Sequence, residues 1–180
     1  MDPMKRPRPA AAQIMTDLHS RTSKRIFVTY HTYQILDTDL PVYPRSLPEE
    51  NSLVVVETNG IAITTGLHSG WVAITVERWA SAPECDLEAW EDVVETPVIW
   101  TNPQMELWGE GEGGILIIPP SQAPGNYRLR VHARNRERRE IERHGELPEG
   151  HLLQLWPSPP KASELLKLTS RYGIRRLAKS

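Results

Sequence analysis

The sequence predicts an all-β protein: an antiparallel β-sandwich of about eight strands, with a disordered N-terminal arm and a short C-terminal α-helix. Three observations predict this class. Short runs alternate β-branched or aromatic residues with polar ones. Turn signals separate these runs at hairpin spacing. No helical period lies between the runs, so nothing indicates crossover helices. A closed barrel is the alternative arrangement of the same strands.

The elements follow in order along the chain. Residues 1–23 place Pro3, Pro7 and Pro9 among charged side chains, and such a segment buries too little apolar surface to order itself. Residues 24–160 are predicted to form the sandwich domain. Its strands are expected at residues 26–35, 53–57, 61–65, 70–79, 90–100, 104–108, 114–118, 126–133 and 151–156.

Two turn signals and one helical segment complete the prediction. Asn59-Gly60 is typical of a tight hairpin, and the glycine-rich run 109–114 indicates a flexible hairpin tip. Residues 161–180 are predicted as a basic C-terminal helix over 163–179, with Ser163 as its N-cap. Leu165, Leu168 and Tyr172 share one face of that helix. A short helix needs a surface for such a face, which the sheet, a second copy in a homodimer, or a partner would supply.

Composition excludes several classes of protein. The single cysteine, Cys85, excludes an internal disulfide framework and a multi-cysteine zinc site. No apolar stretch approaches the about 20 residues of a membrane span, and no signal-peptide core follows the basic N-terminus. We therefore expect a cytoplasmic protein without membrane association.

Catalytic and cofactor motifs are not found in the sequence. The six histidines lack metal-ligand spacing, so we expect no metal and no cofactor. Cys85 lies between Glu84 and Asp86, whose charges raise a thiol pKa and disfavour the nucleophilic thiolate. We assign no catalytic residue and expect a non-enzymatic protein; an enzyme with an unrecognised site remains the second alternative.

Charge is strongly segregated along the chain, although the net charge is only −2. Residues 1–25 carry six Lys or Arg against two acids, and residues 121–180 carry thirteen against six. Between them, residues 26–120 carry only Arg45 and Arg78 against fifteen acids. An acidic body with basic ends favours either contact between the ends and the body or docking on a basic partner.

A cluster of acids is the most specific charged feature. Its members lie within 27 residues that contain no Lys or Arg. Fixed carboxylates can imitate a phosphate backbone and steer a protein to a basic cleft. We therefore assign partner binding to Asp86, Glu88, Glu91, Asp92, Glu95, Glu106, Glu110 and Glu112; an ordinary acidic surface is the alternative.

A basic loop supplies the competing hypothesis. Five arginines between two predicted strands form a candidate nucleic-acid site: Arg134, Arg136, Arg138, Arg139 and Arg143. Glutamates are interleaved with them, and no aromatic residue accompanies them to stack on bases. A solvated charged loop is therefore the favoured interpretation, and nucleic-acid binding through this loop and the C-terminal helix is the alternative function.

Several segments resemble a known family in the same order along the chain. VTYHTYQI (28–35) resembles the Tyr-His start of the competence protein J family. NGIAITTGLHSGWVAITVERW (59–79), WEDVVETPVIWTNPQMELWG (90–109) and ILIIPPSQAPGNYRLRVHA (115–133) are similar to its later strands and turns. The last strand, LLQLWPSPP (152–160), and the basic helix depart from that pattern.

The resemblance covers roughly residues 26–134 and implies a function as well as a fold. The family consists of small bacterial proteins that inhibit a DNA-entry nuclease. It implies a protein-binding module, an inhibitor or immunity-type protein, that docks an acidic surface on a basic protein such as a nuclease. The matching motifs are sheet and turn patterns, so no individual inhibitory residue is transferred.

Overall fold

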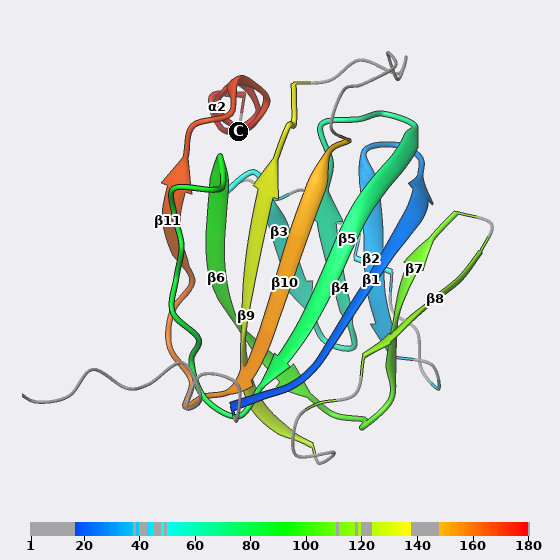
Figure 1. The fold of residues 1–180 in the computed structure, drawn as a ribbon, viewed down its shortest axis with the longest axis vertical. Helices are drawn as coiled ribbons and strands as arrows, with labels where there is room; N and C mark the ends of the chain where they lie inside the picture. Colours follow the sequence, from blue (N-terminus) through cyan, green and yellow to red (C-terminus); the bar gives the residue numbers. More distant parts are fainter. Residues whose placement is uncertain are drawn as a thin grey trace, which may run out of the picture.

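The structure is a computed structural model, and it describes residues 17–37, 39, 43–44, 48, 50–110, 112–117, 119, 124–137 and 148–179. These residues form eleven strands and one helix (Figure 1). The elements are β1 (Leu18–Val28), β2 (Thr32–Asp37), β3 (Val54–Glu57), β4 (Gly60–Thr64), β5 (Gly70–Trp79), β6 (Asp92–Trp100), β7 (Met105–Gly109), β8 (Glu112–Ile117), β9 (Gly125–Arg134), β10 (Gly150–Pro157), β11 (Glu164–Leu168) and α2 (Arg171–Leu177).

Two sheets pack face to face, which confirms the predicted β-sandwich. The six-stranded sheet has the order β1-β5-β10-β9-β6-β11, and the five-stranded sheet behind it has the order β3-β4-β2-β7-β8 (Figure 1). Every described pair of neighbours is antiparallel except β5 and β10, which run parallel. The Asn59-Gly60 hairpin is confirmed between β3 and β4.

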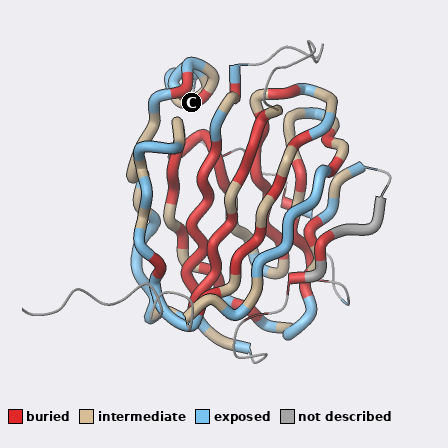
Figure 2. The backbone as a smooth tube through the Cα atoms, in the orientation of Figure 1, coloured by how far each residue is buried: buried red, intermediate tan, exposed pale blue. Residues whose placement is uncertain are grey.

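The core lies between the sheets and follows the predicted alternation. On β5, Val72, Ile74 and Val76 are buried while Trp71 faces outward. The opposing sheet contributes Tyr33 and Ile35 from β2 to the same core cluster. Figure 2 shows buried backbone through the middle strands and a largely exposed β1 at the edge of the six-stranded sheet.

The first predicted strand, residues 26–35, is two strands in different sheets. Thr29 and Thr32 close a turn around Tyr30 and His31, so β1 joins the six-stranded sheet and β2 the five-stranded one. Alternation alone missed this break because neither turn residue is a glycine or proline. The start of β1 also differs from the prediction, since its pairing with β5 orders residues 18–23, which were assigned to the arm. Residues 1–16 lie outside the described part of the chain.

The predicted C-terminal helix is wrong over its first half. Leu165 and Leu168 lie on β11, which pairs with β6, and the helix begins only after Ser170. Ser170, not Ser163, is the N-cap, and its side chain accepts a hydrogen bond from the Gly173 amide. The available edge of β6 outweighs the helical spacing of the two leucines. Because Leu165 and Leu168 lie on a strand paired within the chain, the alternative of a homodimer through them gains no support.

Both faces of β9 are buried, although the alternation of its sequence, with Leu129 and Val131 inward, points Arg128, Arg130 and His132 outward. Segments from elsewhere in the chain cover these side chains. Arg130 donates to the carbonyl of Pro83 (3.1 Å), and Arg128 donates to the carbonyls of Lys161 and Ala162 (2.8 Å each). Around β9, the outer face of the six-stranded sheet therefore carries a polar layer that is buried from solvent.

His132 in this layer gives the fold a measurable acid sensitivity. Burial lowers the pKa of His132 from 6.5 to about 4. Between these values the unfolded chain binds a proton that the folded chain excludes, so falling pH removes about 3 kcal/mol of stability across this window. We expect urea unfolding at pH 7, 5.5 and 4 to show this loss, and His132→Gln to flatten it. Equal slopes in both proteins would contradict the assignment.

Candidate protein-binding surface

The β1–β2 turn presents an aromatic residue to solvent from a strained backbone. Tyr30 and His31 have φ values of 54° and 61°, and the Thr32 amide donates to the Thr29 carbonyl at 3.2 Å. Two successive positive φ values define the type I′ geometry that hairpins favour, but Asn and Gly normally occupy it. For bulky residues each such conformation costs about 1–3 kcal/mol. The Tyr30 side chain is 80% exposed at the tip.

Contacts with the β4–β5 connection hold this turn. The His31 amide donates to the His68 carbonyl (3.1 Å), and the Thr65 amide donates to the His31 carbonyl (2.8 Å). The imidazole of His31 lies 5.0 Å from that of His68 and stacks at 5.5 Å on the ring of Tyr172 in α2. The Tyr30 ring meets His68 edge-on at 5.5 Å. A row of four rings therefore fixes the end of the sandwich drawn uppermost in Figure 1.

A buried carboxylate positions the β4–β5 connection. Glu149 accepts the amides of Gly66 (2.8 Å) and Leu67 (2.9 Å) on its two oxygens. His151 Nε2 lies 3.0 Å from Glu149, and because a carboxylate only accepts, this nitrogen donates. His151 Nδ1 then accepts from the Tyr33 hydroxyl at 2.8 Å. Burial raises the pKa of Tyr33, and the charge of Glu149 raises it further, so the hydroxyl remains a donor.

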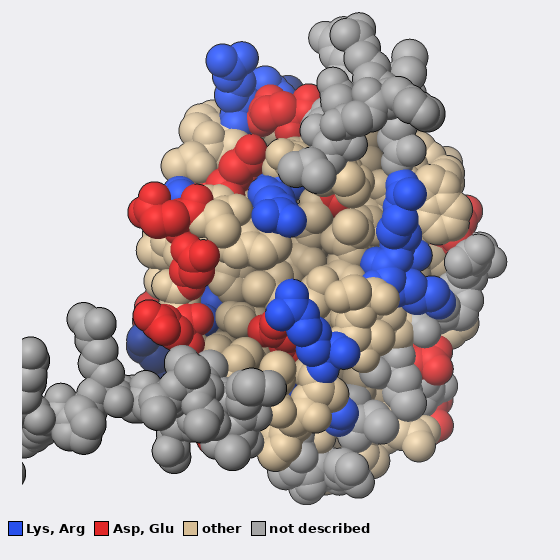
Figure 3. Space-filling view, in the orientation of Figure 1, with Lys and Arg blue, Asp and Glu red and all other residues tan. Residues whose placement is uncertain are grey.

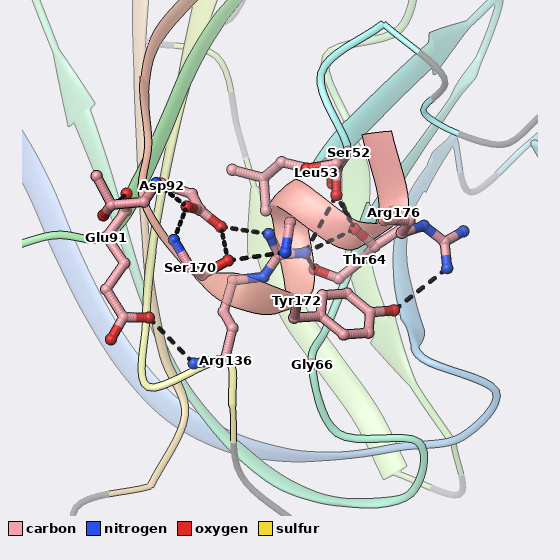
Figure 4. A network of polar contacts seen from close by, with 12 residues as sticks. Ser52, Leu53, Thr64, Gly66, Glu91, Asp92, Arg136, Ser170, Tyr172 and Arg176 are labelled. Atoms are coloured by element: carbon pink, nitrogen blue, oxygen red, sulfur yellow. Dashed lines mark hydrogen bonds and ion pairs between the residues drawn. The ribbon is translucent and has the colours of Figure 1, made fainter. Parts of the chain in front are cut away.

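A second buried network pins helix α2 to both sheets (Figure 4). Arg136 Nη1 pairs with Asp92 at 2.5 Å, and Nη2 donates to the Ser52 carbonyl and the Thr64 hydroxyl at 3.1 Å each. The Ser170 amide and hydroxyl donate to Asp92 at 3.0 and 2.6 Å. Asp92 begins β6 in one sheet, whereas Thr64 ends β4 in the other. The Asp92–Arg136 ion pair therefore connects the two sheets at the same end of the sandwich as the row of rings.

The charge state of Asp92 follows from these contacts. Burial alone would raise the pKa of Asp92, but the Ser170 hydrogen bonds and the Arg136 charge outweigh burial and hold it below its ordinary range. The guanidinium of Arg136 also lies 4.9 Å from the ring of Tyr172. Gly66 allows the backbone of Arg136 to lie close to the β4–β5 connection, since a Cβ at Gly66 would lie 1.8 Å from the Arg136 carbonyl oxygen.

Beside the turn lies an aromatic pocket of about 280 Å³, on the outer face of the five-stranded sheet. Tyr30, Tyr43 and Trp108 line it, and these side chains are 80%, 61% and 44% exposed. Three of the seven large hydrophobic side chains that the described structure exposes thus meet at one place. Tyr and Trp dominate the binding energy of protein interfaces, so this pocket is the strongest candidate site.

A carboxylate closes one side of the aromatic pocket. Glu110 follows β7, and its amide donates to the Phe27 carbonyl at 2.8 Å. The Thr29 hydroxyl donates to its carboxylate. Gly109 permits this approach, because a Cβ there would lie 2.6 Å from the Phe27 carbonyl oxygen. None of the described residues that line the pocket is a lysine or an arginine, so the charge that Glu110 brings to the pocket is negative.

The structure divides the predicted acidic cluster. Asp92 is fully buried against Arg136, and Glu95 binds Arg128 (3.1 Å) and Arg130 (2.6 Å), so assigning these two acids to a docking surface is wrong. Glu91 is half-buried, and Asp86 and Glu88 are exposed before β6. Figure 3, which looks onto the six-stranded sheet, shows acidic side chains gathered on the side where β11 lies.

The remaining acids lie on the other sheet. Glu106 and Trp108 point outward from β7, since Met105 and Leu107 between and beside them are buried. Glu110 lies at the end of the same strand, and the side chain of Glu112 lies outside the described residues. Glu106 and Glu110 are therefore the predicted acids that accompany the aromatic pocket.

The structure buries one of the five arginines of the candidate nucleic-acid site. Arg136 is buried in the ion pair with Asp92, so the prediction that it contacts nucleic acid is wrong. Arg134 is exposed and lies 4.9 Å from the Trp90 ring. Arg138, Arg139 and Arg143 lie outside the described residues.

Three further observations bear on chemistry. Partial burial raises the pKa of the Cys85 thiol, and Glu95 and Asp86 raise it further against the opposing charge of Arg130. Within the described ranges, no three His, Cys, Asp or Glu side chains are placed to hold a metal ion. No helix among those residues is long and apolar enough to cross a membrane.

The β-sandwich of this chain is similar in fold to a solved bacterial structure. The crystal structure of ComJ from Bacillus subtilis, an inhibitor of the DNA degrading activity of NucA, is similar with a TM-score of 0.56 and 11% sequence identity, over 78% of this chain and 98% of that one. The structure of crocagin biosynthetic gene J gives a TM-score of 0.49, 11% identity, and coverage of 78% and 99%. No family sequence model and no curated protein sequence matches the chain.

The similarity to ComJ confirms the predicted resemblance at the level of the fold. Sequence reasoning missed Tyr30, Tyr43 and Trp108 as site residues, because it weighed charge and not exposed aromatic surface. The sequence carries no local signal for this turn, because bulky residues such as Tyr30 and His31 seldom occupy positive φ in a hairpin.

Proposed function

We propose that the chain is a non-enzymatic protein-binding module of the nuclease-inhibitor type, which docks on a basic protein through the aromatic pocket at its β1–β2 turn. The observation that carries this proposal is the meeting of Tyr30, from the β1–β2 turn, with Tyr43 and Trp108 in one exposed pocket. Rigid exposed aromatics lose little conformational entropy on binding and fill pockets of a partner.

Charge supports the choice of a basic partner. Glu106 and Glu110 share the outward face with Trp108, and opposite charge on the partner raises the rate of encounter. The ComJ fold supports an inhibitor role, although a fold alone does not determine function. The partner's catalytic activity is therefore measured separately from its binding.

Site-specific crosslinking tests the proposal. A photoreactive benzoylphenylalanine is placed at Tyr30, and a matched one at Ile99, which is 69% exposed and lies on the other sheet. We expect one basic protein of the native cell to crosslink at position 30 and not at position 99. Purified, that protein should bind the chain in a 1:1 complex and lose its DNA-degrading activity. Identical crosslinks at both positions would overturn the proposed surface.

Truncating the aromatic residues should weaken this complex without unfolding the chain. We expect Tyr30→Ala and Trp108→Ala each to cost about 2 kcal/mol of binding free energy, roughly a thirtyfold loss of affinity by calorimetry. Ile99→Ala is the matched control and should bind as the wild type does. If all three variants bind equally well, the aromatic pocket is not the interface.

A further inference from the structure

We infer that the aromatic pocket receives an arginine side chain of the partner, with its guanidinium group held by Trp108 and the tyrosines and neutralised by Glu110. This inference rests on the proposed function, because it names the group on the partner that the docking surface recognises. The walls of the pocket and its charge each point to a cation.

The walls offer aromatic rings to a cation. A guanidinium within about 6 Å of a ring centroid is attracted by the negative face of the ring, most strongly by tryptophan. The chain uses this contact repeatedly: Arg130 lies 4.9 Å from Trp156, Arg134 lies 4.9 Å from Trp90, and Arg136 lies 4.9 Å from Tyr172. Among the described residues, no cation lies over the rings of Trp108 and Tyr43.

The charge beside these rings is fixed and negative. The Thr29 hydroxyl and the Phe27 carbonyl hold the side chain and the amide of Glu110. The outward side chain of Glu106 adds a second carboxylate two residues from Trp108. A flat guanidinium stacks on an aromatic face and donates to a carboxylate at its edge, whereas a lysine ammonium is a more strongly hydrated point charge. Arginine is therefore the occupant that uses both features.

Titration of the free protein tests the chemistry of the pocket without the partner. The probe is Nα-acetylarginine methylamide, with the citrulline analogue as a neutral control of the same shape and the lysine analogue as the competing cation. Binding is followed by the indole N–H resonance of Trp108 in ¹⁵N-labelled protein, which the Trp108→Phe variant identifies. We expect a saturable shift with arginine, a weaker one with lysine and none with citrulline.

Charge-neutral variants separate the carboxylate from the rings. We expect Glu110→Gln to weaken arginine binding about fivefold, which corresponds to the loss of an exposed ion pair of about 1 kcal/mol. Glu88→Gln is the matched control, because Glu88 is exposed on the connection before β6 and should leave the affinity unchanged. Thermal unfolding of each variant verifies that the fold persists.

The outcomes distinguish this inference from the proposed function. Equal shifts with arginine and citrulline, or none with arginine, overturn the inference, and a stronger shift with lysine overturns the choice of arginine. A partner that still crosslinks at position 30 then leaves the proposed function standing. Conversely, a saturable arginine shift without any partner at position 30 supports the pocket chemistry and contradicts the proposed function.

Discussion

Replacing Arg136 by alanine is expected to lower the free energy of unfolding by about 3–5 kcal/mol, the loss typical of a buried ion pair that loses one partner. The reason is the position of the pair. Both side chains are fully excluded from solvent, so the variant leaves the Asp92 carboxylate buried without its counter-charge. The Ser52 carbonyl and the Thr64 hydroxyl lose a donor as well.

Urea unfolding of a double-mutant cycle measures this contribution. Asp92→Ala should cost a similar amount, because it leaves a buried guanidinium and frees the Ser170 cap. The double variant should lose less than the sum of both, since no unpaired charge remains. Arg134→Ala, at an exposed arginine from the same segment, is the control and should cost no more than about 1 kcal/mol, the loss of its contact with Trp90. Strictly additive losses would contradict a direct pair.

The pH dependence of the wild type gives the same pair a second readout. The folded pKa of Asp92 is lowered, so its contribution is complete above the ordinary value of 3.8 and is lost as pH falls through the folded pKa. Asp92→Asn should remove that part of the acid loss. The His132 effect begins at higher pH, which separates the two groups in one experiment.

Local patterns predicted the strands better than the roles of charged residues. Alternation placed β5 and β9 correctly, because inward positions such as Val72, Ile74 and Val131 repeat every second residue. The same pattern points Arg128 and Arg130 outward, but it does not show that other segments cover them. Their partners are Glu95 and the carbonyls around residues 83 and 161, which lie more than thirty residues away in sequence.

The candidate site shows the same limit. Asp92 and Arg136 look like surface charges in the sequence, because nothing local reveals a pairing across 44 residues. Leu165 and Leu168 fit a helix until the open edge of β6 is known. Tyr30 lies in a run whose composition is that of a strand, and the contacts that bend it come from residues 65–68. Tertiary contacts decide each of these cases.

Glu149→Gln should cost about 3 kcal/mol of stability despite its near-identical shape. Each oxygen of Glu149 accepts a backbone amide, from Gly66 on one side and Leu67 on the other. A glutamine carries one acceptor oxygen and one NH₂ group. In either orientation the NH₂ group faces an N–H donor, so a buried amide loses its partner and a charge-assisted hydrogen bond disappears. Chemical unfolding at pH 7 measures the loss.

Two further variants serve as comparisons for the stability loss of Glu149→Gln. Tyr33→Phe removes only the hydroxyl that donates a hydrogen bond to His151, so we expect a smaller loss of stability, about 1 kcal/mol. Glu88→Gln makes the same chemical change at an exposed position and should be neutral. If Glu149→Gln were no more costly than Glu88→Gln, the two backbone amides would not depend on this carboxylate.

The Glu149→Gln variant also links the buried network to the proposed surface. Glu149 accepts the backbone amides of Gly66 and Leu67. The carbonyl of the next residue, His68, accepts the His31 amide and so holds the strained turn that presents Tyr30. Loosening this connection removes the contacts that offset the cost of two positive φ values. We therefore expect the folded variant, assayed well below its unfolding midpoint, to bind the arginine probe and the partner more weakly than the wild type. Tyr33→Phe keeps both amide contacts of Glu149 and should retain binding. Full binding by Glu149→Gln would show that the turn holds its shape without this support.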